Sequence, residues 1–174
     1  MDDLKEHENQ MDVFRQEIPI ELRKQFENDD DEVTELGEWA YSLQFVQIFQ
    51  HLNNVDRLDL SNQFVFEEFN DKDIIINESE DAKFFYIILQ GAAMVYKTTS
   101  NNGSRVKITK LGPYDHFGGL SLFFHKPYAA TVQAIGPLKC LKMDDKKFQT
   151  NLQPKLIDLE RAAQQYNAFI NFPV

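Results

Sequence analysis

The amino-acid sequence predicts a mainly β domain with flanking helices, built as an eight-stranded β-roll or jelly roll with N-terminal and C-terminal α-helices. Three observations support this. Short apolar runs rich in Phe, Ile, Val and Thr succeed one another from about residue 60 to 143. Turn-forming residues such as Asn, Asp, Gly and Ser separate these runs. The segments on both sides space their apolar residues as helices do, and many short strands at close spacing are typical of a barrel or a double sheet.

The first part of the chain is expected to lie outside the core. Residues 1–32 are polar and end in the acidic run Asp29–Glu32, so we expect an acidic N-terminal appendage with a short helix after Pro19. The domain is expected to occupy residues 33–174, because 43% of the chain is apolar and a core of this size folds without disulfides. It should begin with two helices that break near Ser42 and a third short helix before the β-roll.

The β-roll, at about 60–143, is expected to consist of apolar runs that end at turn sequences. Seven runs have strand composition, namely residues 64–69, 74–76, 84–89, 93–97, 106–111, 129–135 and 139–143. C-terminal helices are expected at about 144–172. There an acidic start precedes apolar residues at helical spacing, namely Leu156, Leu159, Ala163, Tyr166 and Ile170.

The charge of the chain limits its partners. Its 28 acidic and 18 basic residues give a net charge of −10, which repels nucleic acid and anionic membranes. The only basic cluster, at 104–110, alternates apolar and charged residues as a solvated strand face does. No apolar run is long enough to span a bilayer, and the polar N-terminus does not resemble a signal peptide. We therefore expect a cytoplasmic protein with no nucleic-acid partner and no membrane insertion.

Motifs for catalysis or metal binding are missing from the sequence. The four histidines show no ligand spacing and Cys140 is the single cysteine, so neither a metal site nor a cofactor is expected. There is no nucleophile elbow, P-loop or HExxH motif. The chain is therefore expected not to be an enzyme.

One stretch, "FGGLSLFFHKPYAATV" at 117–132, is too apolar for a surface loop and contains a glycine pair. It predicts one buried helical turn whose backbone amides, together with those of the following strand, could hold an anion. The alternative is that the glycines only form a tight corner between strand and helix. The predicted pocket consists of Gly118, Gly119, Leu120, Ser121, Tyr128, Ala129, Ala130 and Thr131.

These motifs carry a resemblance to a known family. Residues 43–170 resemble the cyclic nucleotide-binding domains of cyclic-AMP-dependent kinase regulatory subunits, cyclic-nucleotide-gated channels and bacterial catabolite activator proteins. The resemblance rests on "FFYIILQGAAMVYK" with Gly91 in the family's position, on "LGPYDHFGG" and on "PYAATV". The family's phosphate-binding cassette reads F-G-E-L-A-L and, a few residues later, P-R-A-A-T-V. Two turn glycines of the family are absent, with Lys72 and Ser79 in their places, which suggests relaxed turns.

The chain departs from the family at both side chains that hold the cyclic nucleotide. Gly119 stands in place of the glutamate that binds the ribose 2′-hydroxyl, and Tyr128 stands in place of the arginine that pairs with the phosphate. Tyrosine can donate only one neutral hydrogen bond, whereas a charge-assisted bond contributes roughly 1.5–3 kcal/mol. Binding of cyclic AMP or cyclic GMP is therefore expected to be lost. His116, His125 or Lys126 could supply charge instead, although solvated loop positions explain them more simply.

The resemblance also implies how the pocket is closed. In the family the final helix covers the ligand, so Tyr166 and Phe169 are the candidate lid, in a helix that we expect to be held closed. Tyr128 is expected to turn inward over Gly119 and to fill the empty pocket. The alternative is a solvent-facing Tyr128 beside a hydrated pocket.

Two functions remain open. In the first, the domain has kept the fold but lost the ligand, and it acts as a protein-interaction or structural subunit of a larger assembly, for which ciliary and cytoskeletal assemblies are candidates. In the second, it is a sensor or regulatory domain whose altered pocket binds another ligand, such as an uncharged, nucleoside-like one. Both functions make the chain a binding module without a cofactor.

Overall fold

The computed structural model of the protein describes residues 35–156 continuously, together with six isolated positions between residues 5 and 20. The chain forms two compact units, Met1–Gln63 and Phe64–Val174. Most of the predicted N-terminal appendage lies outside the described residues, so its separation from a domain that starts at residue 33 stays a prediction.

In the first unit, helices lie where the sequence predicts them. Helix α3 covers Glu35–Leu43, the 3-10 turn η1 covers Gln47–Phe49, and helix α4 covers Asn54–Ser61. Asn53 caps α4, because its side-chain oxygen accepts a hydrogen bond from the backbone N–H of Asp56 at 2.8 Å. The expected break between the first two helices is confirmed.

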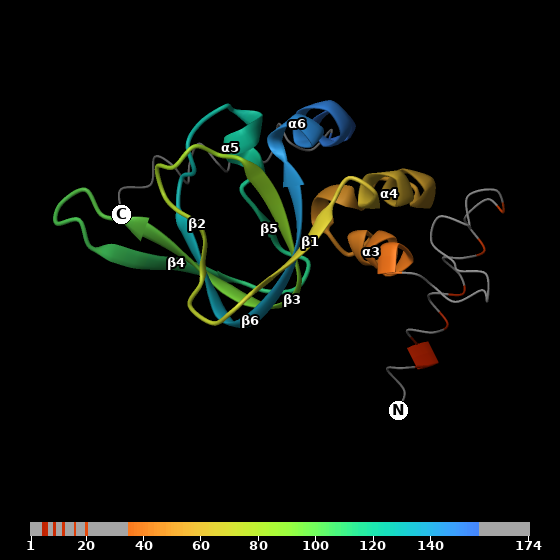
Figure 1. Cartoon of the computed structure of the whole chain (residues 1–174), viewed down its shortest axis with the longest axis horizontal. Helices are drawn as coiled ribbons and strands as arrows, with labels where there is room; N and C mark the ends of the chain where they lie inside the picture. The colour runs from red at the N-terminus through yellow and green to blue at the C-terminus, as the bar shows by residue number, and fades with distance from the viewer. Residues whose placement is uncertain are drawn as a thin grey trace. The chain divides into compact units, whose positions relative to one another are not determined.

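In the second unit, six strands form one antiparallel sheet (Figure 1). The strands are β1 (Val65–Phe69), β2 (Ile74–Ile76), β3 (Phe84–Thr98), β4 (Arg105–Leu111), β5 (His116–Phe117) and β6 (Thr131–Asp144). Their order is β1-β6-β3-β4, with β2 paired to β6 and β5 paired to β3. The mainly β fold class with flanking helices is confirmed.

The described sheet has six strands where eight were expected. Two pairs of the seven predicted runs are single long strands, while β5 lies outside every predicted run. Strand β3 joins the third and fourth predicted runs, and β6 joins the last two. The pairing of β3 with β6 shifts register on both sides of Gln90, and a bulge of this kind bends a strand without ending it. The adjacent Gly91 has φ +96°, and a Cβ atom there would overlap the carbonyl oxygen of Pro137. Glycine therefore permits the close approach of the two strands.

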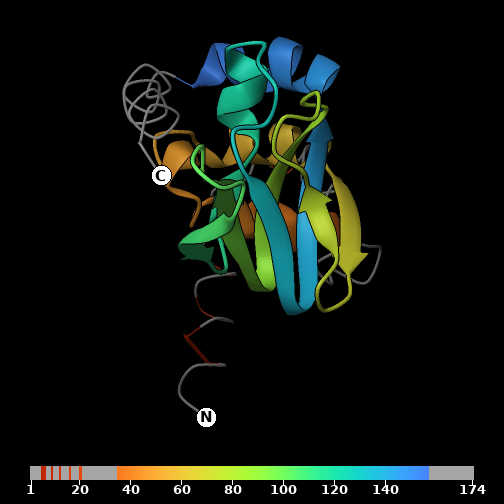
Figure 2. The ribbon, with the colours of Figure 1, turned by 90° about the vertical axis from the view of Figure 1, so that its left-hand side faces the viewer.

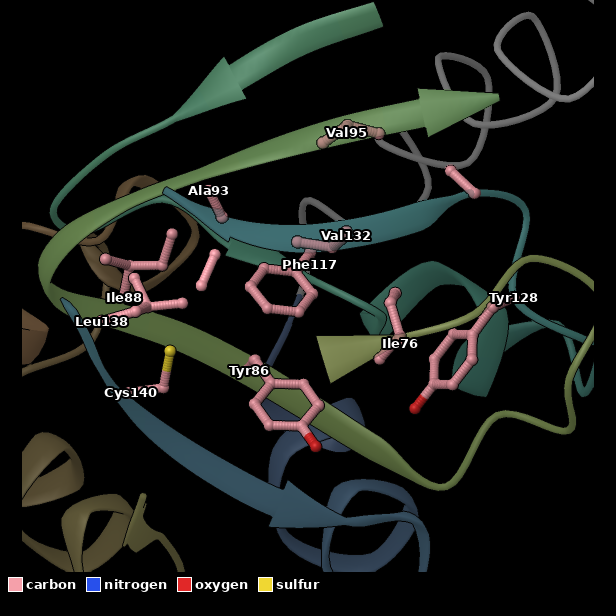
Figure 3. Packing of buried hydrophobic residues seen from close by; sticks show 12 residues of the cluster. Ile76, Tyr86, Ile88, Ala93, Val95, Phe117, Tyr128, Val132, Leu138 and Cys140 are labelled. Atoms are coloured by element: carbon pink, nitrogen blue, oxygen red, sulfur yellow. The ribbon is translucent and has the colours of Figure 1, made fainter. Parts of the chain in front are cut away.

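Buried side chains from four of these strands form an apolar core with Tyr128 and Ala130 (Figure 3). Tyr86 and Phe117 stack in it with their ring centroids 5.0 Å apart. Burial raises the pKa of the Cys140 thiol to about 12, so this cysteine is an inert core residue at neutral pH. The cluster contains Ile76, Tyr86, Ile88, Ala93, Val95, Phe117, Tyr128, Ala130, Val132, Ala134, Leu138 and Cys140.

Short helices cover one end of the sheet (Figure 2). Helix α5 (Gly119–Phe123) is the predicted buried helical turn, with Ser121 and Leu122 buried. The chain after β6 continues as α6 (Asp145–Lys147), a π-helical turn η2 (Phe148–Leu152) and a 3-10 turn η3 (Gln153–Lys155). None of the helices in the described part of the chain is long and apolar enough to cross a membrane.

The two turns in which the family's glycines are replaced are not relaxed. Lys72 and Ser79 both have left-handed backbone conformations, with φ of +69° and +71°. Hydrogen bonds fix these turns, because the N–H of Lys72 donates to the carbonyl of Ala134 at 3.0 Å and the N–H of Ser79 donates to that of Tyr128 at 2.9 Å. The expectation of relaxed turns is therefore wrong, and side chains occupy a conformation that favours glycine.

Replacing Ser79 by glycine is expected to stabilise the protein by about 1 kcal/mol, because a left-handed conformation costs a residue with a side chain roughly 1–2 kcal/mol. Urea denaturation of the Ser79→Gly variant measures this gain. Ser79→Ala is the control, since alanine keeps the Cβ atom that causes the strain and should give no gain. Equal stability of the glycine and alanine variants would contradict the prediction.

Candidate functional site

The corner between β5 and α5 depends on one glycine. Gly118 has φ +85°, and a Cβ atom there would lie 2.6 Å from the carbonyl oxygen of Phe84 and 3.3 Å from the ring of Tyr128. Any larger residue would push the helix away from the start of β3. Gly118 therefore forms a tight corner between strand and helix, which was the alternative interpretation of the glycine pair.

A cavity of about 310 Å³ lies beside this corner. Seven of the eight predicted pocket residues line it, namely Gly118, Gly119, Leu120, Ser121, Tyr128, Ala129 and Ala130. Thr131 does not, because its hydroxyl oxygen accepts a hydrogen bond from the backbone N–H of Glu78 at 3.0 Å. No lysine, arginine, aspartate or glutamate is present among the described residues that line the cavity.

The rest of the cavity wall comes from strand residues outside the predicted pocket, of which only His116 had been considered near the site. These residues are Ile76, Val95, Thr109, Leu111, His116, Phe117 and Val132. Alternation along the predicted strands was the available signal, because every second residue of a strand faces the interior. Alternation along β3 predicts that Val95 faces the interior. Alternation along β4 does not place Thr109 and Leu111 correctly, because the register shifts within that strand.

Tyr128 turns inward, as expected, and only 6% of it is exposed. Figure 3 shows its ring among the core side chains, near Ile76. Its hydroxyl donates a hydrogen bond to the carbonyl of Phe84 at 2.9 Å and accepts one from the N–H of Phe84 at 2.9 Å and one from that of Lys83 at 3.1 Å. A hydroxyl has one donor and two acceptor positions, so this one has none left for a ligand.

The expected position of the Tyr128 ring is corrected in two respects. The ring lies beside Gly118 and not over Gly119, because the hydroxyl is held at the start of β3. It also forms a wall of the cavity and does not fill it. Burial raises the pKa of Tyr128, so the side chain stays neutral at physiological pH.

Gly119 lies against two aromatic rings of the core, Phe85 and Phe148. A Cβ atom at this position would lie 3.0 Å and 3.2 Å from ring atoms of Phe85 and 3.5 Å from the ring of Phe148. The two rings pack against each other with centroids 5.7 Å apart, and each is only 1% exposed. They therefore lie where a side chain at residue 119 would begin, which disfavours a glutamate at this position.

The turn before β3 holds the segment after Pro127 from the other side. The N–H of Tyr128 donates to the carbonyl of Glu80 at 2.9 Å, and the N–H of Ser79 donates back to the carbonyl of Tyr128. With the bond from Glu78 to Thr131, these contacts join the two segments like a short pair of strands. The backbone of the segment is thereby fixed.

Lys97 is a cation beside this segment that the sequence analysis missed. Its ammonium group donates to the carbonyl of Ala129 at 2.7 Å and lies 3.5 Å from the carboxylate of Glu78. The other carboxylate oxygen of Glu78 accepts from the N–H of Thr98 at 2.8 Å. Lys97 is therefore bound to the protein and does not line the cavity.

The other candidate cations do not supply charge to the cavity either. His116 lines it, but burial lowers the pKa of this histidine to about 4, so the imidazole is neutral at pH 7. His125 and Lys126 are exposed and line a separate hollow of about 240 Å³ beside Asp81 and Asp145. No group of three potential metal ligands occurs within the described residues. The candidate lid residues, Tyr166 and Phe169, lie outside them.

Removing the Tyr128 hydroxyl is expected to destabilise the protein by about 1–3 kcal/mol, because the partly buried groups of Lys83 and Phe84 lose their partner. Thermal and urea denaturation of Tyr128→Phe measure the loss. Tyr96→Phe is the matched control, since Tyr96 is only partly buried and should change stability by less than about 0.5 kcal/mol. A Tyr128→Phe protein as stable as the control would contradict the assigned hydrogen bonds.

The lowered pKa of His116 predicts that the free energy of unfolding decreases in acid. The folded protein keeps this imidazole neutral down to about pH 4, whereas the unfolded chain takes up its proton near the ordinary histidine pKa of 6.5. Protons therefore favour unfolding, and the contribution of His116 to stability is present above about pH 6.5 and lost towards pH 4. In the His116→Gln variant, the free energy of unfolding should therefore depend less on pH between these two values. His125→Asn, at an exposed position, should leave the slope unchanged.

Comparisons with known proteins agree with this geometry. The family model "Cyclic nucleotide-binding domain" matches residues 66–154, just over half of the chain. A cAMP-dependent protein kinase regulatory subunit from Dictyostelium discoideum is 31% identical over 133 residues, which cover 75% of this chain and 41% of that protein.

Solved structures lead to the same family. The regulatory domain of Toxoplasma gondii protein kinase A with cAMP has a TM-score of 0.70 at 25% identity, covering 75% of this chain and 50% of that one. The regulatory subunit of a cAMP-independent protein kinase A from Trypanosoma brucei has a TM-score of 0.69 at 27% identity, covering 76% and 48%. This chain thus spans half or less of the length of these relatives. With the family model, the sheet and the cavity in agreement, the chain belongs to the cyclic nucleotide-binding domain family.

Proposed function

We propose that the chain is a non-catalytic regulatory module that does not respond to cyclic AMP or cyclic GMP and that acts through protein partners. One observation carries this proposal: the described cavity lining has no cation, and the Tyr128 hydroxyl is fully used by the backbone. A cyclic nucleotide carries a negative charge on its phosphate. Burying that charge without a cation costs several kcal/mol, which is enough to abolish micromolar binding.

Two relatives support this assignment. The Trypanosoma brucei protein is a regulatory subunit of a kinase that is cAMP-independent, so a member of this family can regulate without this ligand. The Dictyostelium discoideum relative is also a kinase regulatory subunit. A regulatory subunit acts on another protein chain, which favours protein partners here. The ciliary and cytoskeletal assemblies named above stay predictions.

The open cavity favours a second function, namely binding of an uncharged ligand. Its volume of about 310 Å³ lies at the lower end of the range for small-molecule pockets. Most of its lining is apolar, while Thr109, Ser121 and the neutral imidazole of His116 are polar groups without charge. This combination suits a flat, uncharged molecule with hydrogen-bonding edges. A nucleoside without phosphate has this chemistry.

Matched ligand pairs test both functions. Adenosine and cyclic AMP, or guanosine and cyclic GMP, differ only by the cyclic phosphate. We expect neither cyclic nucleotide to bind with a Kd below about 100 µM, whereas a nucleoside should raise the melting temperature and give a measurable Kd. Calorimetry and thermal denaturation of the full chain provide both readouts.

A cavity-filling variant separates specific from nonspecific binding. Ala129→Leu adds volume at a residue that lines the cavity, and it should weaken nucleoside binding at least tenfold. Ala92→Leu is the matched control at a partly buried alanine outside the lining, and it should bind as the natural chain does. If all four ligands fail to bind, the second function is refuted and the first stands. Low-micromolar binding of a cyclic nucleotide overturns the first.

A further inference from the structure

The charge of the chain is distributed unevenly. About one residue in six of the whole sequence is acidic, yet residues 84–114 contain no aspartate or glutamate. The same segment carries Lys97, Arg105, Lys107 and Lys110, a charge of +4 within a chain of −10. It comprises β3, β4 and their connecting turn. The β3–β4 hairpin is therefore the most positively charged part of the described sheet.

The pairing register places three of these cations on one face. Met94, Tyr96 and Thr98 alternate along β3, so they share a face of the strand. Their partners on β4 are Lys110, Lys107 and Arg105, in that order, and residues directly opposite each other share a face. A register shift between Val95 and Tyr96 keeps Lys110 on this face with the other two cations. We call these six residues the basic hairpin face.

The opposite face of the hairpin lines the cavity. Val95 pairs with Thr109, and both line the cavity, as does Leu111. The cations thus lie on the face that points away from the ligand site, and all three are exposed. The basic hairpin face is therefore separate from the proposed pocket.

These cations are not used inside the described fold. Lys97, Lys139 and Lys142 each form an ion pair with a glutamate, whereas no ion pair occurs between Arg105, Lys107 or Lys110 and another described residue. Strand β4 also ends the sheet, since β3 is its only partner among the described strands (Figure 1). The open side of an edge strand offers unpaired N–H and C=O groups to a further strand.

We propose that the basic hairpin face and the open edge of β4 bind an extended acidic segment of a protein partner. Acidic side chains at alternate positions of an added strand face one side and can meet Arg105, Lys107 and Lys110, while its backbone pairs with β4. The rest of the chain carries a net charge of −14, because +4 of a total of −10 lies in the hairpin. A long polyanion such as nucleic acid would meet that repulsion, whereas a short acidic segment contacts only the hairpin. This inference rests on the proposed function only in taking the partner to be a protein.

Fluorescence anisotropy with two labelled peptides tests the proposal on the full chain. One peptide alternates glutamate with valine or threonine, and the other has glutamine in place of each glutamate. The glutamate peptide should bind at least tenfold more tightly, and its affinity should fall between about 0.05 and 0.5 M salt. Equal binding of the two peptides would overturn the proposal, as would tighter binding of a DNA duplex.

Charge-reversal variants locate the contact. The double variant Arg105→Glu with Lys107→Glu should lose at least tenfold in affinity for the glutamate peptide. The matched control is Lys126→Glu with Lys146→Glu, which makes the same change in net charge at exposed residues outside the hairpin. Thermal denaturation checks that both variants fold. Equal affinities of the two variants would refute the assigned surface, and neither result changes the outcome of the nucleoside experiments.

Discussion

The hydroxyl group of Tyr128 is the constraint on which the site depends. Its three hydrogen bonds join the segment after Pro127 to the start of β3, more than forty residues earlier in the chain. They hold the ring against the Gly118 corner and so give the cavity one of its walls. Because every bonding position of the hydroxyl is occupied, Tyr128 has a structural role and links two distant segments of the chain. The neutral character of the cavity follows from this arrangement together with the partly buried, uncharged His116.

Much of the fold and of the site could be predicted from the sequence, because it depends on local chemistry. Turn residues and β-rich runs locate the strands, and the cassette motif identifies seven of the eight residues that were expected to line the cavity. What failed depends on contacts between distant segments. A break in periodicity does not tell whether a strand ends or bends, so the bulge beside Gly91 was counted as a strand boundary. The strained conformation of Ser79 arises because its N–H is bound to Tyr128, a partner that no local pattern indicates.

The bulge in β4 gives the hairpin two different faces. Without it, strict alternation would place Thr109 on the same side as Lys107 and would turn Lys110 towards the interior. The shift directs Thr109 and Leu111 to the cavity and keeps the three cations outside. One irregularity of the backbone thus separates an apolar pocket from a charged surface across the thickness of a single sheet. The proposed ligand pocket and the proposed partner surface thus lie on opposite faces of the hairpin.

The contact of Phe85 and Phe148 with Gly119 has a consequence for any attempt to redesign the pocket. Placing a glutamate at this position requires these rings to shift by a few tenths of an ångström, because the β-carbon would lie 3.0 Å from a ring atom of Phe85 and both rings are only 1% exposed. Protein interiors are closely packed, so neighbouring side chains of the core would have to take up that shift. The identity of residue 119 therefore affects the packing of the core as well as the lining of the cavity.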